Sequence, residues 1–306
     1  MSTATETKKP LPESVSPSQQ HKGSLAILAA ALLWSTAGLL IKYIPWHPMA
    51  IASGRGLLVA LIMLVYYRKR LTVRLNLTTW LSGLALVATQ SLFVIANKLT
   101  TAANAIMLQY SAPIFIIIIG LVLYRSRPAR RDVLIMFWAL AGIVLFFFDD
   151  LSAGHQLGNL LALVTGLTFA AVFVFNNRPD CHVPAALLIG QIGTFLAGLP
   201  WLLALPREQI QPMPVFALLM LGLFQHGLGY ILFQFGIRLT QPLNASLLSM
   251  IEPIMNPVWV FLLLNEKPGR MALIGAVIVI SAVLYLNLRP VRIARPAASE
   301  TPLSES

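Results

Sequence analysis

The chain has 306 residues, of which 57% are hydrophobic and only 11% are charged. A soluble globular domain carries about 25% charged residues, so the composition excludes that class and indicates an integral membrane protein. The net charge of +11 does not indicate a nucleic-acid partner, because Lys and Arg gather at the ends of long apolar runs, where the positive-inside rule places them.

The two ends of the chain are polar and rich in Ser, Pro and Thr. We expect residues 1–22 and 291–306 to be disordered tails. The first apolar run is too long for a signal peptide and lacks a small-residue cleavage site after it. The single cysteine, Cys181, excludes an intramolecular disulfide and a cysteine-based metal site, and no cofactor or metal is expected.

Between the tails, the sequence predicts an all-α, polytopic fold. A helix needs about 20 mainly apolar residues to cross the hydrocarbon core of a bilayer. Ten such runs occur, at 24–44, 48–67, 79–98, 104–124, 132–149, 158–177, 184–205, 213–236, 242–264 and 270–288. The connectors are short, so consecutive helices are expected to pack as antiparallel hairpins. No connector is long enough to hold a soluble domain.

Orientation follows from the positive charges of the connectors. With the N-terminus inside, sixteen Lys and Arg lie in the inner connectors and tails and four in the outer connectors. The positive-inside rule then places both termini in the cytoplasm. We expect a multi-pass protein of the cell membrane, in a bacterium the inner membrane, with the lipid bilayer as its surroundings.

An internal repeat relates the two halves of the chain. Residues 99–130 align without a gap over residues 239–270. Identical pairs outside the apolar residues are Thr100 and Thr240, Asn104 and Asn244, Pro113 and Pro253, Pro128 and Pro268, and Arg130 and Arg270. The chain is therefore predicted to be a duplicated five-helix unit, with halves at 23–150 and 151–290. Because five is odd, the halves would cross the membrane in opposite directions, as in many transporters that work by alternating access.

The stretch "SMIEPIMNP" contains the most unusual residues of any predicted span. Glu252 lies near the middle of its span, where an ionised acid costs about 2.5–3.5 kcal/mol unless it faces protein or water. Pro253 and Pro257 each remove a backbone hydrogen bond, and Asn256 lies one turn beyond Glu252. The pattern favours a substrate or coupling site on a bent helix. The alternative is that Pro253, like Pro113 in the first half, only shapes its helix.

Arg55, inside the second span, has three open interpretations. It binds a substrate carboxylate, it neutralises Glu252 as a static partner, or it extends along the helix to the outer surface. Gly54 and Gly56 flank it and would let a neighbouring helix approach closely.

His226 lies in the middle of the eighth span, with Tyr230 four residues later. It is a candidate to exchange protons with Glu252 or, alternatively, a neutral imidazole bonded to a backbone carbonyl. Trp34, in the middle of the first span, is a candidate cavity wall, as is Tyr230. The other polar residues within or near the spans are expected to join helices by hydrogen bonds. They are Gln90, Asn97, Gln109, Tyr110, Asn176 and Gln191.

Several segments resemble the EamA-type transporters of the drug/metabolite transporter superfamily. They are "GSLAILAAALLWSTAGLLIK" in the first span, "ASGRGLLVALIML" in the second, and the aligned pair that begins "NKLTTAANAIMLQYSAPIF" and "GIRLTQPLNASLLSMIEPIMNP". The resemblance covers residues 23–289 and implies ten helices that carry small metabolites such as amino acids, sugars or nucleosides. One departure is "YRSRP", where the family often has an acid; the second half keeps it as Glu266 in "NEKP".

We therefore predict a secondary transporter, not an enzyme, that moves a small metabolite such as an amino acid by alternating access, with export the expected direction. Proton coupling and an uncoupled facilitator both stay open, as does a homodimer. An intramembrane enzyme acting on a lipid, with Glu252 and His226 as acid and base, is the alternative from another class, and a membrane scaffold is a third. No G-x-x-x-x-G-K-[ST] motif is present, which argues against direct ATP drive.

Overall fold

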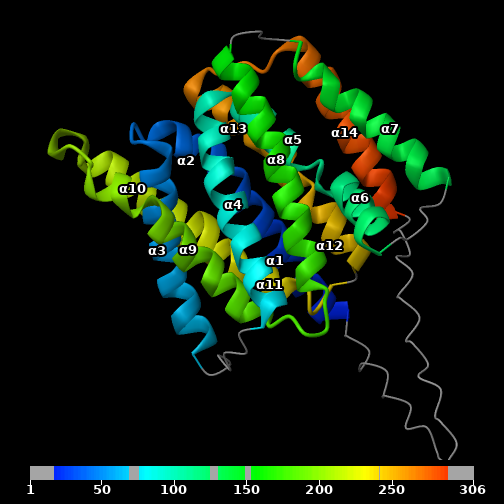
Figure 1. Cartoon of the computed structure of the whole chain (residues 1–306), viewed down its shortest axis with the longest axis horizontal. Helices are drawn as coiled ribbons and strands as arrows, with labels where there is room; N and C mark the ends of the chain where they lie inside the picture. Colours follow the sequence, from blue (N-terminus) through cyan, green and yellow to red (C-terminus); the bar gives the residue numbers. More distant parts are fainter. Residues whose placement is uncertain (1–16, 69–75, 125–129, 149–152, 241, 289–306) are drawn as a thin grey trace, which may run out of the picture.

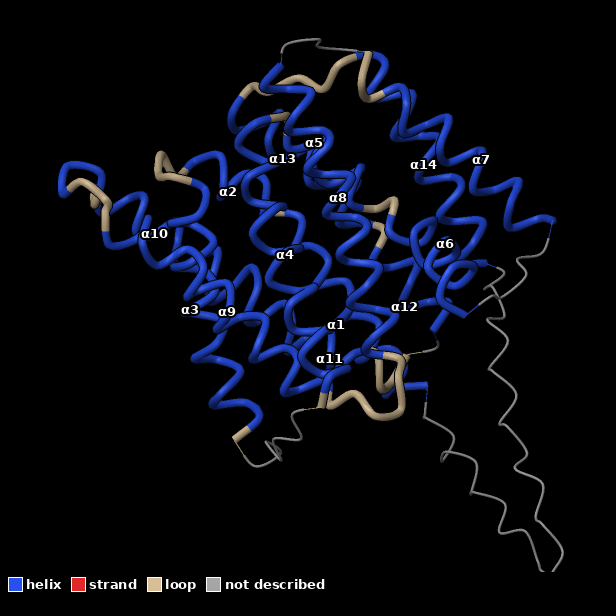
Figure 2. The backbone as a smooth tube through the Cα atoms, viewed as in Figure 1, coloured by secondary structure: helices blue, strands red, loops and turns tan. Residues whose placement is uncertain are grey.

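The structure is a computed structural model that describes residues 17–68, 76–124, 130–148, 153–240 and 242–288. The described part is helical and contains no strand (Figure 2). The predicted tail at 291–306 and residues 1–16 of the other tail lie outside it. Residues 17–22 were also expected in the tail, but helix α1 begins at Pro17. Proline is tolerated in the first turn of a helix, and Gln and Lys, which follow it, are good helix formers.

The first half contains seven helices: α1 (Pro17–Ser35), α2 (Ala37–Tyr43), α3 (Pro48–Tyr67), α4 (Leu77–Leu99), α5 (Ala102–Gln109), α6 (Ala112–Tyr124) and α7 (Arg130–Leu145). The second half begins with α8 (Ala153–Asn176), α9 (Val183–Leu203), a short 3-10 turn η1 (Arg207–Gln209) and α10 (Pro212–Leu219). It continues with a π-helical segment η2 (Met220–Leu228), α11 (Gly229–Gly236), α12 (Pro242–Ser249), α13 (Ile251–Leu264) and α14 (Arg270–Leu288).

Side chains and prolines fix several helix starts. Asn76 accepts a hydrogen bond from the Thr79 amide at 2.9 Å and caps α4, and Thr101 caps α5 in the same way. His47 caps α3, where Pro48 occupies the first turn. Asn265 ends α13 in the left-handed conformation, with a φ of 57°. Local sequence chemistry thus sets these boundaries.

Eight helical segments in the described chain are long and apolar enough to cross a membrane. The two other predicted spans, 132–149 and 270–288, contain shorter apolar stretches, Val133–Leu145 and Arg270–Tyr285. The prediction of ten full-length spans is therefore supported for eight. The helices of these two spans, α7 and α14, pack against each other at one end of the molecule (Figure 1).

Three of the predicted spans are interrupted. The first breaks at Thr36, between α1 and α2, and the fourth breaks between α5 and α6. The ninth breaks at Met250, between α12 and α13. In the alignment of the two halves, α5 and α12 begin and end at matching residues, and α6 and α13 end at matching residues. The repeated sequence therefore folds with the same interruption in both halves.

Helices from the two halves pack against each other along the bundle. The contacting pairs include α3 with α9, α4 with α8 and α9, and α1 with α11. Glycines permit the closest approaches: a Cβ built on Gly56 of α3 would lie 2.8 Å from the carbonyl oxygen of Gln191 on α9. The predicted role of Gly56 is confirmed. The opposite faces of the spans expose large apolar side chains such as Leu61 and Val65, as expected for contact with lipid.

At the end of the bundle expected to face the cytoplasm, the α8–α9 connector is tied to the start of α4. The Thr78 hydroxyl donates to Asp180 Oδ2 at 2.6 Å, and the His182 amide donates to Thr79 Oγ1 at 3.0 Å. The hydrogen bond from Thr78 lowers the pKa of Asp180 below its ordinary value of 3.8.

This contact predicts a small acid dependence of stability. Because the folded pKa of Asp180 is lowered, its contribution is fully present above pH 3.8 and is lost as the pH falls through the lower folded value. The melting temperature of purified Asp180→Asn should therefore change less with pH in this acid range than that of the unsubstituted protein. An unchanged pH profile in Asp180→Asn would show that the exposed carboxylate adds nothing.

Candidate functional site

Glu252 is a partly exposed carboxylate at the break between α12 and α13. The Tyr110 hydroxyl of α5–α6 donates to Glu252 Oε2 at 3.0 Å and lies 3.4 Å from the carbonyl oxygen of Ser249. That carbonyl is free of its helical partner because Pro253 has no N–H group. Glu252 forms no ion pair among the described residues, so the predicted alternative of a static Glu252–Arg55 pair is wrong.

Asn256 lies one turn beyond Glu252 but in a different environment. It is fully buried, and neither its amide oxygen nor its amide nitrogen has a hydrogen-bond partner in the described chain. A Cβ built on Gly38 of α2 would lie 2.5 Å from Asn256 Oδ1, so the amide fills the space that this glycine leaves. Buried amides without partners are uncommon and are candidates for contact with a ligand or water.

Arg55 is buried inside the bundle, with 2% of its surface exposed. Its guanidinium donates to the backbone oxygen of Gln90 on α4 at 3.2 Å and to the side-chain Oε1 of the same residue. Its Nε has no partner in the described chain. The interpretation that Arg55 extends to the outer surface is therefore wrong, because the close approach of α4 and α9 encloses it.

His226 lies in the π-helical segment η2, next to Gln90 and Gln191. Its Nε2 is 3.0 Å from Gln90 Nε2 and 3.4 Å from Gln191 Nε2 of α9. Arg55, Gln90, Gln191 and His226 form what we call the Arg55 cluster, to which four different helical elements contribute. The predicted alternative of an imidazole bonded to a backbone carbonyl is wrong, because side-chain amides are its partners. Glu252 and His226 bond to different groups, which gives no support to an acid–base pair.

An aromatic surface adjoins this cluster. The ring centroids of His226 and Tyr230 are 6.1 Å apart, those of Tyr230 and Trp34 are 6.2 Å apart, and those of Trp34 and Phe233 are 5.0 Å apart. Trp34 and Tyr230, predicted separately as cavity walls, are thus brought together. The indole Nε1 of Trp34 is buried without a partner in the described residues.

Gln225 is a site candidate that sequence reasoning missed. It is buried on η2 and donates through Nε2 to the backbone oxygen of Trp34 at 3.2 Å, while its Oε1 has no partner among the described residues. The sequence did contain a signal, because Gln225 places a polar amide within the apolar run 213–236. Other predicted contacts between helices are seen: Asn176 accepts from Ser82 at 2.7 Å. Asn97 is fully buried and has no such partner in the described chain.

Glu266, the acid that only the second half keeps, forms an ion pair with the first half. Its Oε2 lies 3.0 Å from Lys42 Nζ at the end of α2, with side-chain exposures of 23% and 19%. Its Oε1 accepts from the Ala102 amide at the start of α5, at 2.7 Å. Lys42 also donates to the carbonyl oxygen of Thr100 at 2.7 Å. One carboxylate thus joins α2, α5 and the α13–α14 connector.

Two substitutions separate the two roles of Glu266. Glu266→Gln keeps an oxygen for the Ala102 amide and loses the charge. Because the ion pair is partly exposed, we expect the free energy of unfolding to fall by about 1 kcal/mol or less. Glu266→Ala also leaves the Ala102 amide without its acceptor, although Thr101 still caps α5, and should cost about 1 kcal/mol more. Thermal unfolding of the purified protein measures both, with Lys267→Gln at the neighbouring exposed position as the control. Equal losses in the two variants would contradict the role of Glu266 as acceptor for this amide.

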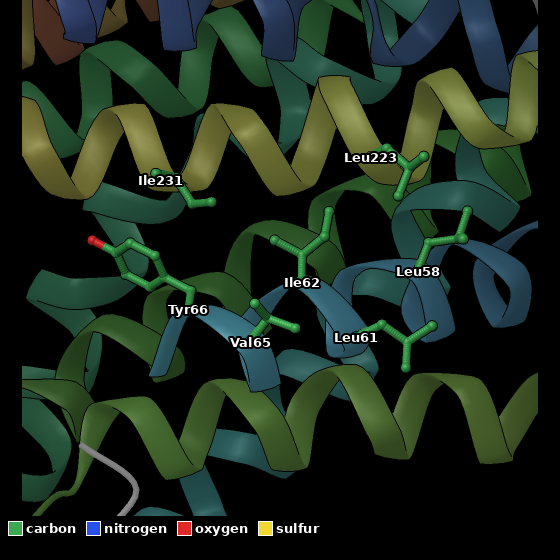
Figure 3. A pocket seen from close by; sticks show the side chains of 7 residues that line it. All are labelled: Leu58, Leu61, Ile62, Val65, Tyr66, Leu223 and Ile231. Carbon is green, nitrogen blue, oxygen red and sulfur yellow. The ribbon is translucent and has the colours of Figure 1, made fainter. Parts of the chain in front are cut away.

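An apolar groove lies between α3 and the η2–α11 segment (Figure 3). Its volume is about 380 Å³. The lining residues are Leu58, Leu61, Ile62, Val65, Tyr66, Leu223 and Ile231. No charged side chain lines it, so it does not select a polar metabolite. Among the described residues, no group of three or more His, Cys, Asp or Glu forms a metal site.

The model of the EamA-like transporter family matches the chain twice, at residues 21–148 and 156–288. Two proteins of Archaeoglobus fulgidus, each named an uncharacterized transporter, are similar over most of their length. One is 26% identical over 284 residues, which is 87% of this chain and 97% of that protein. The other is 24% identical over 266 residues, which is 86% and 95%.

A solved structure titled "Crystal structure of protein" shares the fold, with a TM-score of 0.58 at 18% identity, over 89% of this chain and 99% of that one. The family match covers both halves of the chain and confirms the resemblance predicted from its motifs. This protein is a multi-pass membrane transporter and belongs to the EamA-like transporter family.

Proposed function

We propose that the protein is a secondary transporter that moves a small metabolite, such as an amino acid, by alternating access between residues 23–150 and 151–290. The double family match and the aligned breaks of α5–α6 and α12–α13 support a duplicated unit. With five predicted spans in each unit, the two units are inverted relative to each other and both termini are cytoplasmic. Inverted units give two conformations of similar free energy, which alternating access requires.

The observation that carries this proposal is the hydrogen bond between Glu252 and Tyr110. The carboxylate belongs to the second half and the hydroxyl to the first, and their oxygens are 3.0 Å apart. Movement of one half against the other would break this bond and free the carboxylate for a substrate or a proton. Glu252 is therefore assigned to substrate contact or proton coupling, because an ionisable group within a span has a function by default.

The prolines are assigned to the bending that such movement needs. Pro113 and Pro253 lie just after the breaks in their respective spans, and Pro257 lies inside α13. A proline inside a helix removes one backbone hydrogen bond and weakens the helix there. The helix segments on either side of each break can then change their angle without loss of further hydrogen bonds.

The test is transport of a pooled metabolite mixture in sealed vesicles. Vesicles that contain the full chain are compared with protein-free vesicles, and both uptake and efflux are measured, with export expected. Depletion of one compound only with the protein identifies the substrate and the direction. The same mixture is incubated with the protein in detergent, where an altered product would favour the enzyme alternative. No movement and no product would contradict transport of the metabolites in the mixture.

A further inference from the structure

The Arg55 cluster contains a buried positive charge without a negative partner. Among the described residues, no carboxylate lies within ion-pair distance of Arg55, which has 2% of its surface exposed. A guanidinium offers five N–H donors, but the hydrogen bonds of Arg55 all go to one neutral residue, Gln90. Burial of a charge costs several kcal/mol unless it is paired, and an unpaired one inside a membrane protein marks a functional position.

The hydrogen bonds also fix the charge of the rest of the cluster. Gln90 turns its oxygen to Arg55, so its amide nitrogen faces His226. An amide nitrogen only donates, so His226 Nε2 accepts and the imidazole is neutral. Gln191 points a second amide nitrogen to the same atom at 3.4 Å, while its own oxygen has no partner in the described chain. The cluster therefore carries one net positive charge.

We propose that the Arg55 cluster binds the carboxylate of a small organic acid or amino acid. When no substrate is bound, the Gln90 side chain accepts the hydrogen bond of the Arg55 guanidinium that the carboxylate would otherwise accept. This inference rests on the transport function proposed above and names its substrate class. The two oxygens of a carboxylate accept two parallel hydrogen bonds from a planar guanidinium and neutralise its charge. The single oxygen of a neutral amide does neither.

The surroundings of the cluster fit the remainder of such a substrate. His226 and Tyr230 are only half-buried and lie on the same side as Trp34, whose ring centroid is 6.2 Å from that of Tyr230. An apolar substrate side chain can pack on these rings, and the unpartnered Trp34 Nε1 and Gln225 Oε1 supply a donor and an acceptor nearby. The site thus combines one charge with an apolar wall.

The test uses Gln90→Glu, which has nearly the same shape and places a permanent carboxylate beside Arg55. We expect this variant to melt at a higher temperature and to lose carboxylate binding, because its own side chain occupies the guanidinium. Gln109→Glu on α5, which lies outside the cluster, is the matched control. If Gln90→Glu does not fold, Gln90→Ala is the second variant. It keeps the charge of Arg55 and removes the side chain that occupies its guanidinium, so it should bind carboxylates more tightly.

Binding is measured on the purified full chain by ligand-induced shifts of thermal unfolding. The probes are matched acids and amides: L-leucine and L-leucinamide, benzoate and benzamide, succinate and succinamide. For at least one pair, we expect the acid to bind about tenfold more tightly than the amide, which corresponds to ~1.4 kcal/mol. The preference should vanish in Gln90→Glu and persist in Gln109→Glu.

Three results would overturn the inference: equal binding of acids and amides, an acid preference that survives in Gln90→Glu, or no binding of any acid in the panel. A purely structural Arg55 would allow the higher melting temperature of Gln90→Glu but not the loss of binding. Failure here is distinguishable from failure of the transport function. Vesicles that move a neutral metabolite would leave transport standing and refute only the anion site.

Discussion

Glu252→Gln is expected to reduce proton-gradient-driven accumulation of the substrate at least about tenfold, to near the level of protein-free vesicles. Glutamine keeps the shape of the side chain and an oxygen that accepts from Tyr110, but it cannot bind and release a proton. A carboxylate held by one hydroxyl across the two halves is the group whose protonation such coupling would use. The measurement is accumulation in vesicles with an imposed pH gradient, at matched protein content.

Two control variants separate proton coupling from other roles of Glu252. Tyr110→Phe removes the hydroxyl but leaves the carboxylate, so accumulation should fall less than in Glu252→Gln. Glu208→Gln, at an exposed acid in the turn η1, should have no effect. Substrate exchange without a gradient should survive in Glu252→Gln if the carboxylate only couples protons, and should also be lost if it contacts the substrate. Unchanged gradient-driven accumulation would refute both roles.

Features that depend on short segments could be predicted from the sequence. Eight of the ten apolar runs correspond to helices that can cross a membrane, because run length and hydropathy determine insertion. The breaks next to Pro113 and Pro253 lie at aligned positions, as the repeat and the chemistry of proline indicate. For α14, the predicted run 270–288 has the same bounds as the helix itself, Arg270–Leu288.

The partners of the polar side chains could not be predicted, because they depend on how distant helices pack. Glu252 and Arg55 were natural partners by charge, yet the fold directs one to Tyr110 and the other to Gln90. His226 lies in a π-helical segment, whose wider turn changes which residues face α4 and α9. The 3.6-residue periodicity of an α-helix, from which the face of each residue is predicted, does not apply to this π-helical turn.

Gly56→Leu is expected to destabilise the protein by about 3 kcal/mol and to abolish transport. A Cβ at this position would lie 2.8 Å from the carbonyl oxygen of Gln191 and 3.0 Å from the amide nitrogen of Phe195. Both atoms belong to the backbone of α9, which cannot rotate away as a side chain does, and overpacking of this kind costs about 1–3 kcal/mol. Thermal unfolding of the purified protein and transport in vesicles measure the two effects.

The position of Gly56 links this packing to the Arg55 cluster. Gly56 follows Arg55 directly, and the backbone oxygen that it approaches belongs to Gln191, so a wider gap between α3 and α9 would separate two members of the cluster. Gly154→Leu is the matched control, because a Cβ at Gly154 meets nothing within 4 Å. There the better helix propensity of leucine should leave stability equal or higher by up to about 1 kcal/mol. If Gly56→Leu were as stable and active as this control, α3 and α9 would not form the fixed contact on which the geometry of the Arg55 cluster depends.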